Sequence, residues 1–112
     1  MLYVVIGLFA VAAVMGAVIA NAIISGRSST PKPAVFGHGL FAVAALGLLI
    51  YYALQNPDYP QLALILFVVA AVGGIILLVR DLQKKPGPVA LVVIHALVAV
   101  SAFVILLVFA IF

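Results

Sequence analysis

The stretch HGLFAVAALG, residues 38–47, returns 57 positions later as HALVAVSAFV, residues 95–104. The two stretches hold the only histidines of the chain, and the same shift aligns Pro31 with Pro88. A shift of 58 aligns FAVAAVMG, residues 9–16, with FVVAAVGG, residues 67–74, at six of eight positions. Self-similarity at a fixed period indicates a duplicated unit. We therefore predict one domain, residues 1–112, built from two tandem repeats of residues 1–57 and 58–112.

The composition is typical of an integral membrane protein. Of the 112 residues, 70% are hydrophobic and 6% are charged, and the mean hydropathy of +1.55 lies far above that of a soluble domain. Four apolar runs, residues 1–25, 34–55, 60–80 and 88–112, each approach the ~20 residues that cross a bilayer core. The first run lacks a basic start, so we interpret it as a membrane span and not as a signal peptide.

These runs predict an all-α fold, a four-helix transmembrane bundle made of two repeated helical hairpins. Each repeat crosses the membrane twice, so the pseudo-two-fold axis that relates them should run along the membrane normal. Short connections make sequential helices neighbours, which would place the second and fourth helices on a diagonal of the bundle.

The basic residues define an orientation in the membrane. All five lie in or beside the first and third connections: Arg27, Lys32, Arg80, Lys84 and Lys85. By the positive-inside rule that side is cytoplasmic, and both termini are periplasmic. The net charge of +3 is thereby explained without nucleic acid, which we do not expect as a partner.

The histidines are the candidate metal ligands. Val35, His38 and Ala42 begin a stripe that continues in steps of three and four, and the equivalent stripe contains His95. Small and polar residues mark the buried face of a membrane helix, so both imidazoles should point inward at the same depth. Two histidines on opposing helices are typical of a b-type haem with bis-imidazole ligation. The absence of cysteine excludes the covalent attachment of c-type haem and thiolate metal sites.

The predicted haem site has further members of two kinds. Small residues would leave room for the macrocycle, and basic residues equivalent under the repeat would pair with its propionates. With His38 and His95 as metal ligands, the predicted cofactor-binding residues are Gly16, Arg27, Gly37, Gly39, Ala42, Gly74, Lys85 and Ala99. Asn21 could accept a hydrogen bond from a histidine, or could bond only to its own helix. No catalytic residue is predicted.

Other functions stay open. The main alternative is a non-catalytic membrane scaffold or accessory subunit of a larger complex, in which the histidines only hold the bundle together. Self-association through small-residue faces of the first and third helices is compatible with either function. A zinc site would need more ligands than two histidines. The only acids, Asp58 and Asp81, are expected in the second and third loops, which disfavours a transporter.

The repeated frame of a Lys-Pro loop followed by His-Gly-Leu or His-Ala-Leu resembles a group of small, uncharacterised four-helix proteins of the bacterial inner membrane. The resemblance covers the whole chain and implies that location. The predicted site is also similar in plan to the bis-histidine membrane cytochromes b. That similarity implies electron exchange with a quinone or a redox partner protein near the cytoplasmic face. Members of the cytochrome b group that carry electrons across the membrane use two haems and four histidines, whereas the two histidines of this chain provide for one haem.

Overall fold

The computed structural model describes all 112 residues and contains four α-helices and no strand. The helices are α1 (Leu2–Ile24), α2 (Lys32–Gln55), α3 (Gln61–Leu82) and α4 (Val89–Ile111). Each is long and apolar enough to cross a membrane. The predicted all-α bundle of four apolar helices is confirmed, and each helix begins and ends within two residues of the predicted run.

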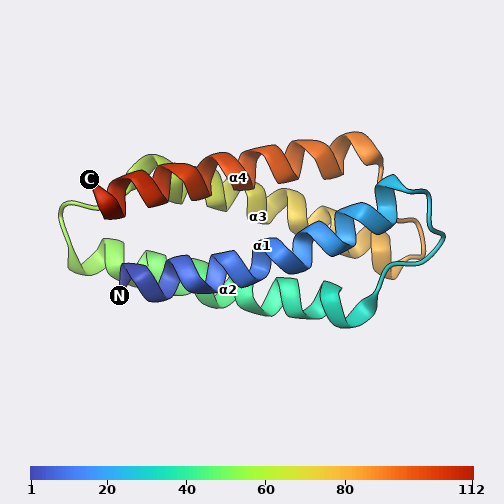
Figure 1. Ribbon diagram of the computed structural model, residues 1–112, viewed down its shortest axis with the longest axis horizontal. Coiled ribbons are helices and arrows are strands. Elements are labelled where there is room, and N and C mark those ends of the chain that lie inside the picture. The colour runs from blue at the N-terminus through green and yellow to red at the C-terminus, as the bar shows by residue number, and fades with distance from the viewer.

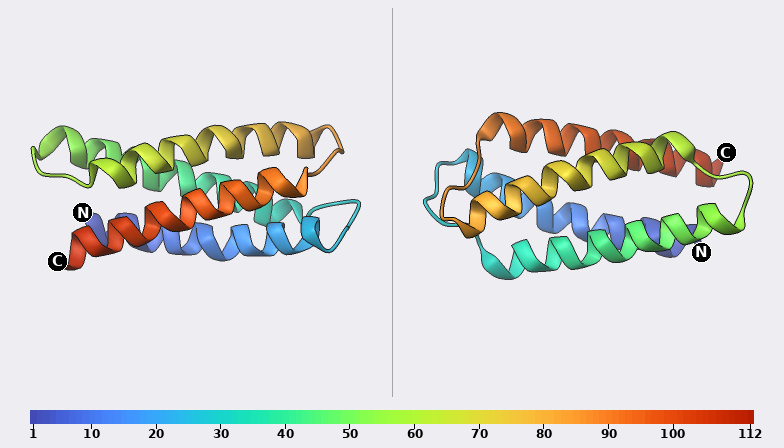
Figure 2. Two further views of the ribbon diagram at one scale, coloured as in Figure 1. Left: turned by 90° about the horizontal axis from the view of Figure 1, so that it is seen from above. Right: turned by 180° about the vertical axis from the view of Figure 1, so that it is seen from behind.

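The helices run up and down along an axis of 45 Å, and the bundle measures 22 × 20 Å across (Figure 1). Both termini and the loop between α2 and α3 lie at one end, and the other two loops lie at the opposite end (Figure 2). We call the latter the loop end. Contacts are most extensive within the α1–α2 and α3–α4 hairpins, and less extensive between α1 and α4 and between α2 and α3. The pairs α1 and α3, and α2 and α4, therefore occupy the two diagonals, as the short connections predict.

The helix ends follow from local sequence. Pro31, Pro60 and Pro88 immediately precede α2, α3 and α4, where a missing N–H is tolerated. At the loop end, α1 is followed by Gly26 with φ 81° and α3 by Lys84 with φ 61°. In each case the next residue donates its N–H back to a carbonyl five residues earlier, which is the Schellman ending of a helix. Gly26 adopts this left-handed conformation freely, whereas Lys84 does so against its preference.

One buried cluster holds the half of the bundle nearer the termini. It consists of Val5, Phe9, Ala45, Leu49, Ala63, Phe67, Ala102 and Leu106. Phe9 and Phe67 lie parallel across the α1–α3 diagonal, with ring centroids 3.8 Å apart and 2° between the planes. The outer surface carries large apolar side chains such as Leu40, Val43 and Leu97, each more than 60% exposed. A soluble monomer rarely exposes so much continuous apolar surface, whereas lipid accommodates it.

Candidate functional site

The two histidines lie on α2 and α4, and each bonds to the other helix of its own hairpin. His38 Nδ1 lies 2.7 Å from the carbonyl oxygen of Ala12 on α1. His95 Nδ1 lies 2.8 Å from the carbonyl oxygen of Ala70 on α3. A carbonyl oxygen only accepts hydrogen bonds, so Nδ1 donates in both rings. Each neutral ring therefore keeps a free lone pair on Nε2, the form in which imidazole binds a metal.

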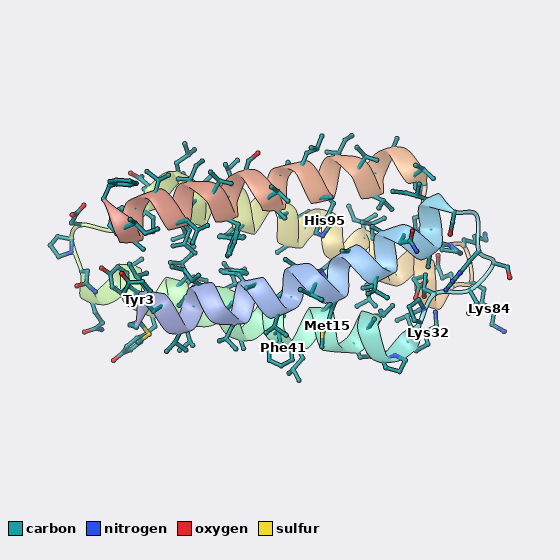
Figure 3. The ribbon with its side chains drawn as sticks, viewed as in Figure 1. Tyr3, Met15, Lys32, Phe41, Lys84 and His95 are labelled. Carbon is teal, nitrogen blue, oxygen red and sulfur yellow. The ribbon has the colours of Figure 1, made fainter.

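The two rings meet across the α2–α4 diagonal. Their centroids are 6.2 Å apart and their planes are nearly perpendicular, at 81°. Figure 3 shows His95 in the interior of the bundle. Neither Nε2 atom forms a hydrogen bond, so the pair is held by Nδ1 alone.

Two glycines allow the close approach of helix and ring. A Cβ added to Gly16 on α1 would lie 3.0 Å from Cε1 of His38, and one added to Gly74 on α3 would lie 3.1 Å from Cε1 of His95. Both distances are shorter than ordinary van der Waals contact. The predicted members Gly16 and Gly74 therefore contact the imidazoles, in addition to lining the space between the helices.

A cavity of about 450 Å³ surrounds the histidine pair and is lined mainly by apolar side chains from all four helices. Phe9 and Phe67 line the end of the cavity that is nearer the termini. Val5 and Ala63, which lie beyond them, do not line the cavity. Towards the loop end the cavity reaches Ile23 and Asp81. The aromatic pair thus closes the cavity on the side of the termini.

The cavity also opens sideways between the hairpins. Ala13 and Ala17 on α1 line the cavity and are exposed. The same is true of Ala96 and Val100 on α4. These two helices touch less extensively than the helices within a hairpin. The cavity therefore borders the apolar outer surface at the α1–α4 seam, and it does so at the α2–α3 seam through the exposed Val43 and Ile75.

The remaining predicted site residues are distributed differently. Gly39, Ala42 and Ala99 line the cavity. Gly37 lies outside it, and a Cβ there would lie 2.6 Å from Sδ of Met15, so this glycine accommodates a methionine. Arg27 and Lys85 are exposed in the loops and line no cavity.

For Asn21 one of the two alternatives is excluded, and for Asp81 the expected position in a loop is wrong. Asn21 is exposed, and no histidine bonds to it, because the backbone carbonyls of α1 and α3 occupy both Nδ1 atoms. Asp81 lies in the last turn of α3 and not in a loop, and it is 6% exposed. Its oxygens are bound by the Thr30 hydroxyl at 2.6 Å and by Nζ of Lys32 at 2.7 Å.

The Thr30–Lys32–Asp81 cluster was not foreseen from the sequence. It joins the first loop and the start of α2 to the end of α3, residues about fifty positions apart. Thr30 is 4% exposed, and Lys32 Nζ also donates to its hydroxyl at 2.8 Å. The one available signal was the rarity of acids in the chain, because a lone carboxylate near buried apolar segments requires a partner.

The chain was compared with protein-family models, curated proteins and solved structures, and none of them matches it.

Proposed function

We propose that the protein is a small b-type membrane cytochrome that binds one haem b between α2 and α4, with His38 and His95 as the residues that would hold its iron. One observation carries this proposal: the two rings lie 6.2 Å apart and line a shared cavity, each fixed through Nδ1 and each with Nε2 free of hydrogen bonds. Hydrogen bonding of Nδ1 to a backbone carbonyl is the usual way in which a ligand histidine is oriented.

The spacing of the rings fits this role. Metal–imidazole bonds of about 2 Å would place two in-line Nε2 atoms about 4 Å apart. The ring radii then bring the centroids to a spacing close to the observed 6.2 Å. The nearly perpendicular ring planes are compatible with this role, because a metal–nitrogen bond would leave each imidazole free to turn about it.

Bound haem would supply a one-electron couple at its iron. The chain's own contribution is to orient two neutral imidazoles and to surround the centre with apolar side chains that exclude water. Gly39, Ala42 and Ala99 line that space without filling it. A quinone or a protein partner would exchange electrons with the site.

The proposal includes a duplicated fold. It is supported by contacts that repeat under the shifts found in the sequence. The bond from His38 to Ala12 corresponds to that from His95 to Ala70, and the contact of Gly16 with its histidine corresponds to that of Gly74. The buried cluster divides into the same pairs: Val5 and Ala63, Phe9 and Phe67, Ala45 and Ala102, Leu49 and Leu106. We infer two tandem hairpins related by a pseudo-two-fold axis along the membrane normal.

We further propose that the protein is a multi-pass protein of the bacterial inner membrane with both termini periplasmic. The basic residues support this orientation, because Arg27, Lys32, Lys84 and Lys85 all belong to the loop end (Figure 1). Positively charged loops stay on the cytoplasmic side during insertion. A reporter enzyme that is active only in the periplasm should therefore be active when it is fused to either terminus.

A structural histidine pair in a membrane scaffold is the second candidate. It is favoured by the same Nδ1 bonds, because each one cross-links the two helices of a hairpin without any ligand. In this function the cavity would hold lipid or a neighbouring chain, and the protein would be an accessory subunit or a homo-oligomer.

The visible spectrum of the protein separates the two functions. Purified in mild detergent from haem-sufficient cells, the cytochrome should show a Soret band that shifts on reduction. His38→Gly and His95→Gly should each lose the six-coordinate low-spin spectrum, and added imidazole should restore it by occupying the space that the side chain leaves. Ser101→Ala, on the exposed side of α4, is the matched control and should leave the spectrum unchanged. Folded protein that stays colourless after haem supplementation would support the scaffold.

A further inference from the structure

A second, polar pocket of about 300 Å³ lies at the loop end. Ser28, Ser29 and Lys32 line it from the first loop and the start of α2, and Asp81 and Lys84 line it from the end of α3. Its lining contains a single hydrophobic residue. Figure 3 shows Lys32 and Lys84 at this end of the bundle.

The pocket carries a net positive charge. Asp81 is neutralised inside it, because its two oxygens accept from Thr30 and from Lys32. The Lys32–Asp81 contact is the one salt bridge of the chain, so the Lys84 ammonium is unpaired. The hydroxyls of Ser28 and Ser29 add hydrogen-bond donors. Such a lining favours an anion.

Asp81 also lines the central cavity, so the two spaces share a wall. Gly74, which contacts His95, precedes Asp81 by seven residues of the same helix. At 1.5 Å per residue the polar pocket therefore begins about 10 Å from the imidazoles along the bundle. A ligand that occupied both spaces would have an apolar body with a metal at its centre. Its acidic side chains would extend about 10 Å from that centre.

We infer that the polar pocket binds a propionate carboxylate of the porphyrin, with the Lys84 ammonium as its cation and the Ser28 and Ser29 hydroxyls as donors. This inference rests on the proposed haem site and assigns its charged end. Arg27 and Lys85, which the sequence suggested for the same role, line neither space. The Lys32 ammonium is held by Asp81 and Thr30, so Lys84 supplies the free positive charge of the pocket.

The backbone of Lys84 offers a variant that separates charge from folding. Its φ of 61° is a conformation that glycine adopts without strain. Lys84→Gly therefore removes the ammonium while the helix ending is kept. Arg27→Gln and Lys85→Gln are matched controls, since each removes one exposed loop charge of the same sign. Lys32→Gln leaves the Asp81 carboxylate without its cation beside the pocket, which should also weaken the binding of an anion.

The test compares porphyrins with free and with esterified propionates. Protoporphyrin IX, haemin and their dimethyl esters are titrated into the full-length apoprotein in detergent. The metal-free pair reports the recognition of the carboxylates without iron ligation. We expect the free acids to bind about tenfold more tightly than the esters, and Lys84→Gly and Lys32→Gln each to lower that preference about threefold to fivefold. Arg27→Gln and Lys85→Gln should retain it.

The outcomes are distinct for the two proposals. Equal binding of acid and ester by the wild-type protein, or equal losses in Arg27→Gln and Lys84→Gly, would overturn the assignment of the polar pocket. If that result came with a histidine-dependent Soret band, the haem site would stand and only the propionate pocket would fail. Acid preference that depends on Lys84, without any histidine-dependent band, would support the pocket and reject the iron ligation.

Discussion

The ring of Phe9 lies flat against that of Phe67, although the two residues are 58 positions apart and belong to helices on a diagonal of the bundle. This stacked pair joins the two hairpins within the buried cluster. It closes the cavity at the end opposite the basic loops. The stability of the hairpin–hairpin interface should therefore depend on this pair.

Truncation of either ring should be costly. Phe9→Ala and Phe67→Ala are each expected to lower the free energy of unfolding by about 3–5 kcal/mol, because each leaves a cavity among buried neighbours. A double-mutant cycle should yield a coupling of about 1 kcal/mol from the lost stacking. Unfolding in mixed detergent micelles, followed by circular dichroism, measures all four states. Strictly additive losses would show that the rings act independently.

Helix glycines that contact a histidine and helix glycines in open space should respond oppositely to alanine. Gly16→Ala and Gly74→Ala should destabilise the protein by about 1–3 kcal/mol, because the new methyl group presses on an imidazole. Gly7→Ala and Gly47→Ala meet nothing within 4 Å and should stabilise their helices by about 0.5–1 kcal/mol. Thermal unfolding of the four variants in one detergent provides the comparison. An increase in stability for Gly16→Ala would contradict the close contact with His38.

The helix ending at Lys84 predicts a stabilising substitution. Lys84→Gly should raise the free energy of unfolding by about 0.4–1 kcal/mol, because glycine relieves the left-handed backbone conformation. Lys85→Gly, one position later, has no such strain to relieve and is the control. Urea or detergent denaturation of both variants checks the difference. A loss of stability in Lys84→Gly would indicate that its side chain stabilises the loop end.

The Thr30–Lys32–Asp81 cluster should be asymmetric towards mutation. Lys32→Ala leaves the buried carboxylate of Asp81 with Thr30 as its single partner and should cost about 1–2 kcal/mol. Asp81→Asn leaves a lysine whose side chain is 44% exposed and reaches water, so its effect should be smaller. Removing both charges in Lys32→Ala with Asp81→Asn should restore part of the loss. A larger effect of Asp81→Asn than of Lys32→Ala would argue against this reasoning.

The sequence predicted the architecture well, because apolar runs of fixed length and charged connections follow directly from the physics of the bilayer. It also predicted that His38 and His95 would approach one another, since both lie on stripes of small residues at equal distances from Pro31 and Pro88. Their role as iron ligands stays a prediction. The residues of α2 that are buried against the other helices, Val35, Ala45 and Leu49, lie on the stripe that the helical period predicts.

Three features of the site could not be read from the sequence. The Nδ1 partners are backbone carbonyls, and every residue carries one, so residue types give no signal for Ala12 and Ala70. Gly37 accommodates Met15, a contact that depends on how α1 and α2 are rotated about their axes. The burial of Asp81 depends on the path of the first loop, which brings Thr30 and Lys32 to the end of α3.

The sideways opening between α1 and α4 has a consequence for how molecules reach the histidines. Ala13, Ala17 and Ala96 border it, so a lipid-dissolved molecule meets only methyl groups along this path. A hydrated solute arriving at the loops instead meets the ion pair of Lys32 and Asp81. The imidazoles should therefore be reached more readily by reactants dissolved in the membrane than by reactants dissolved in water.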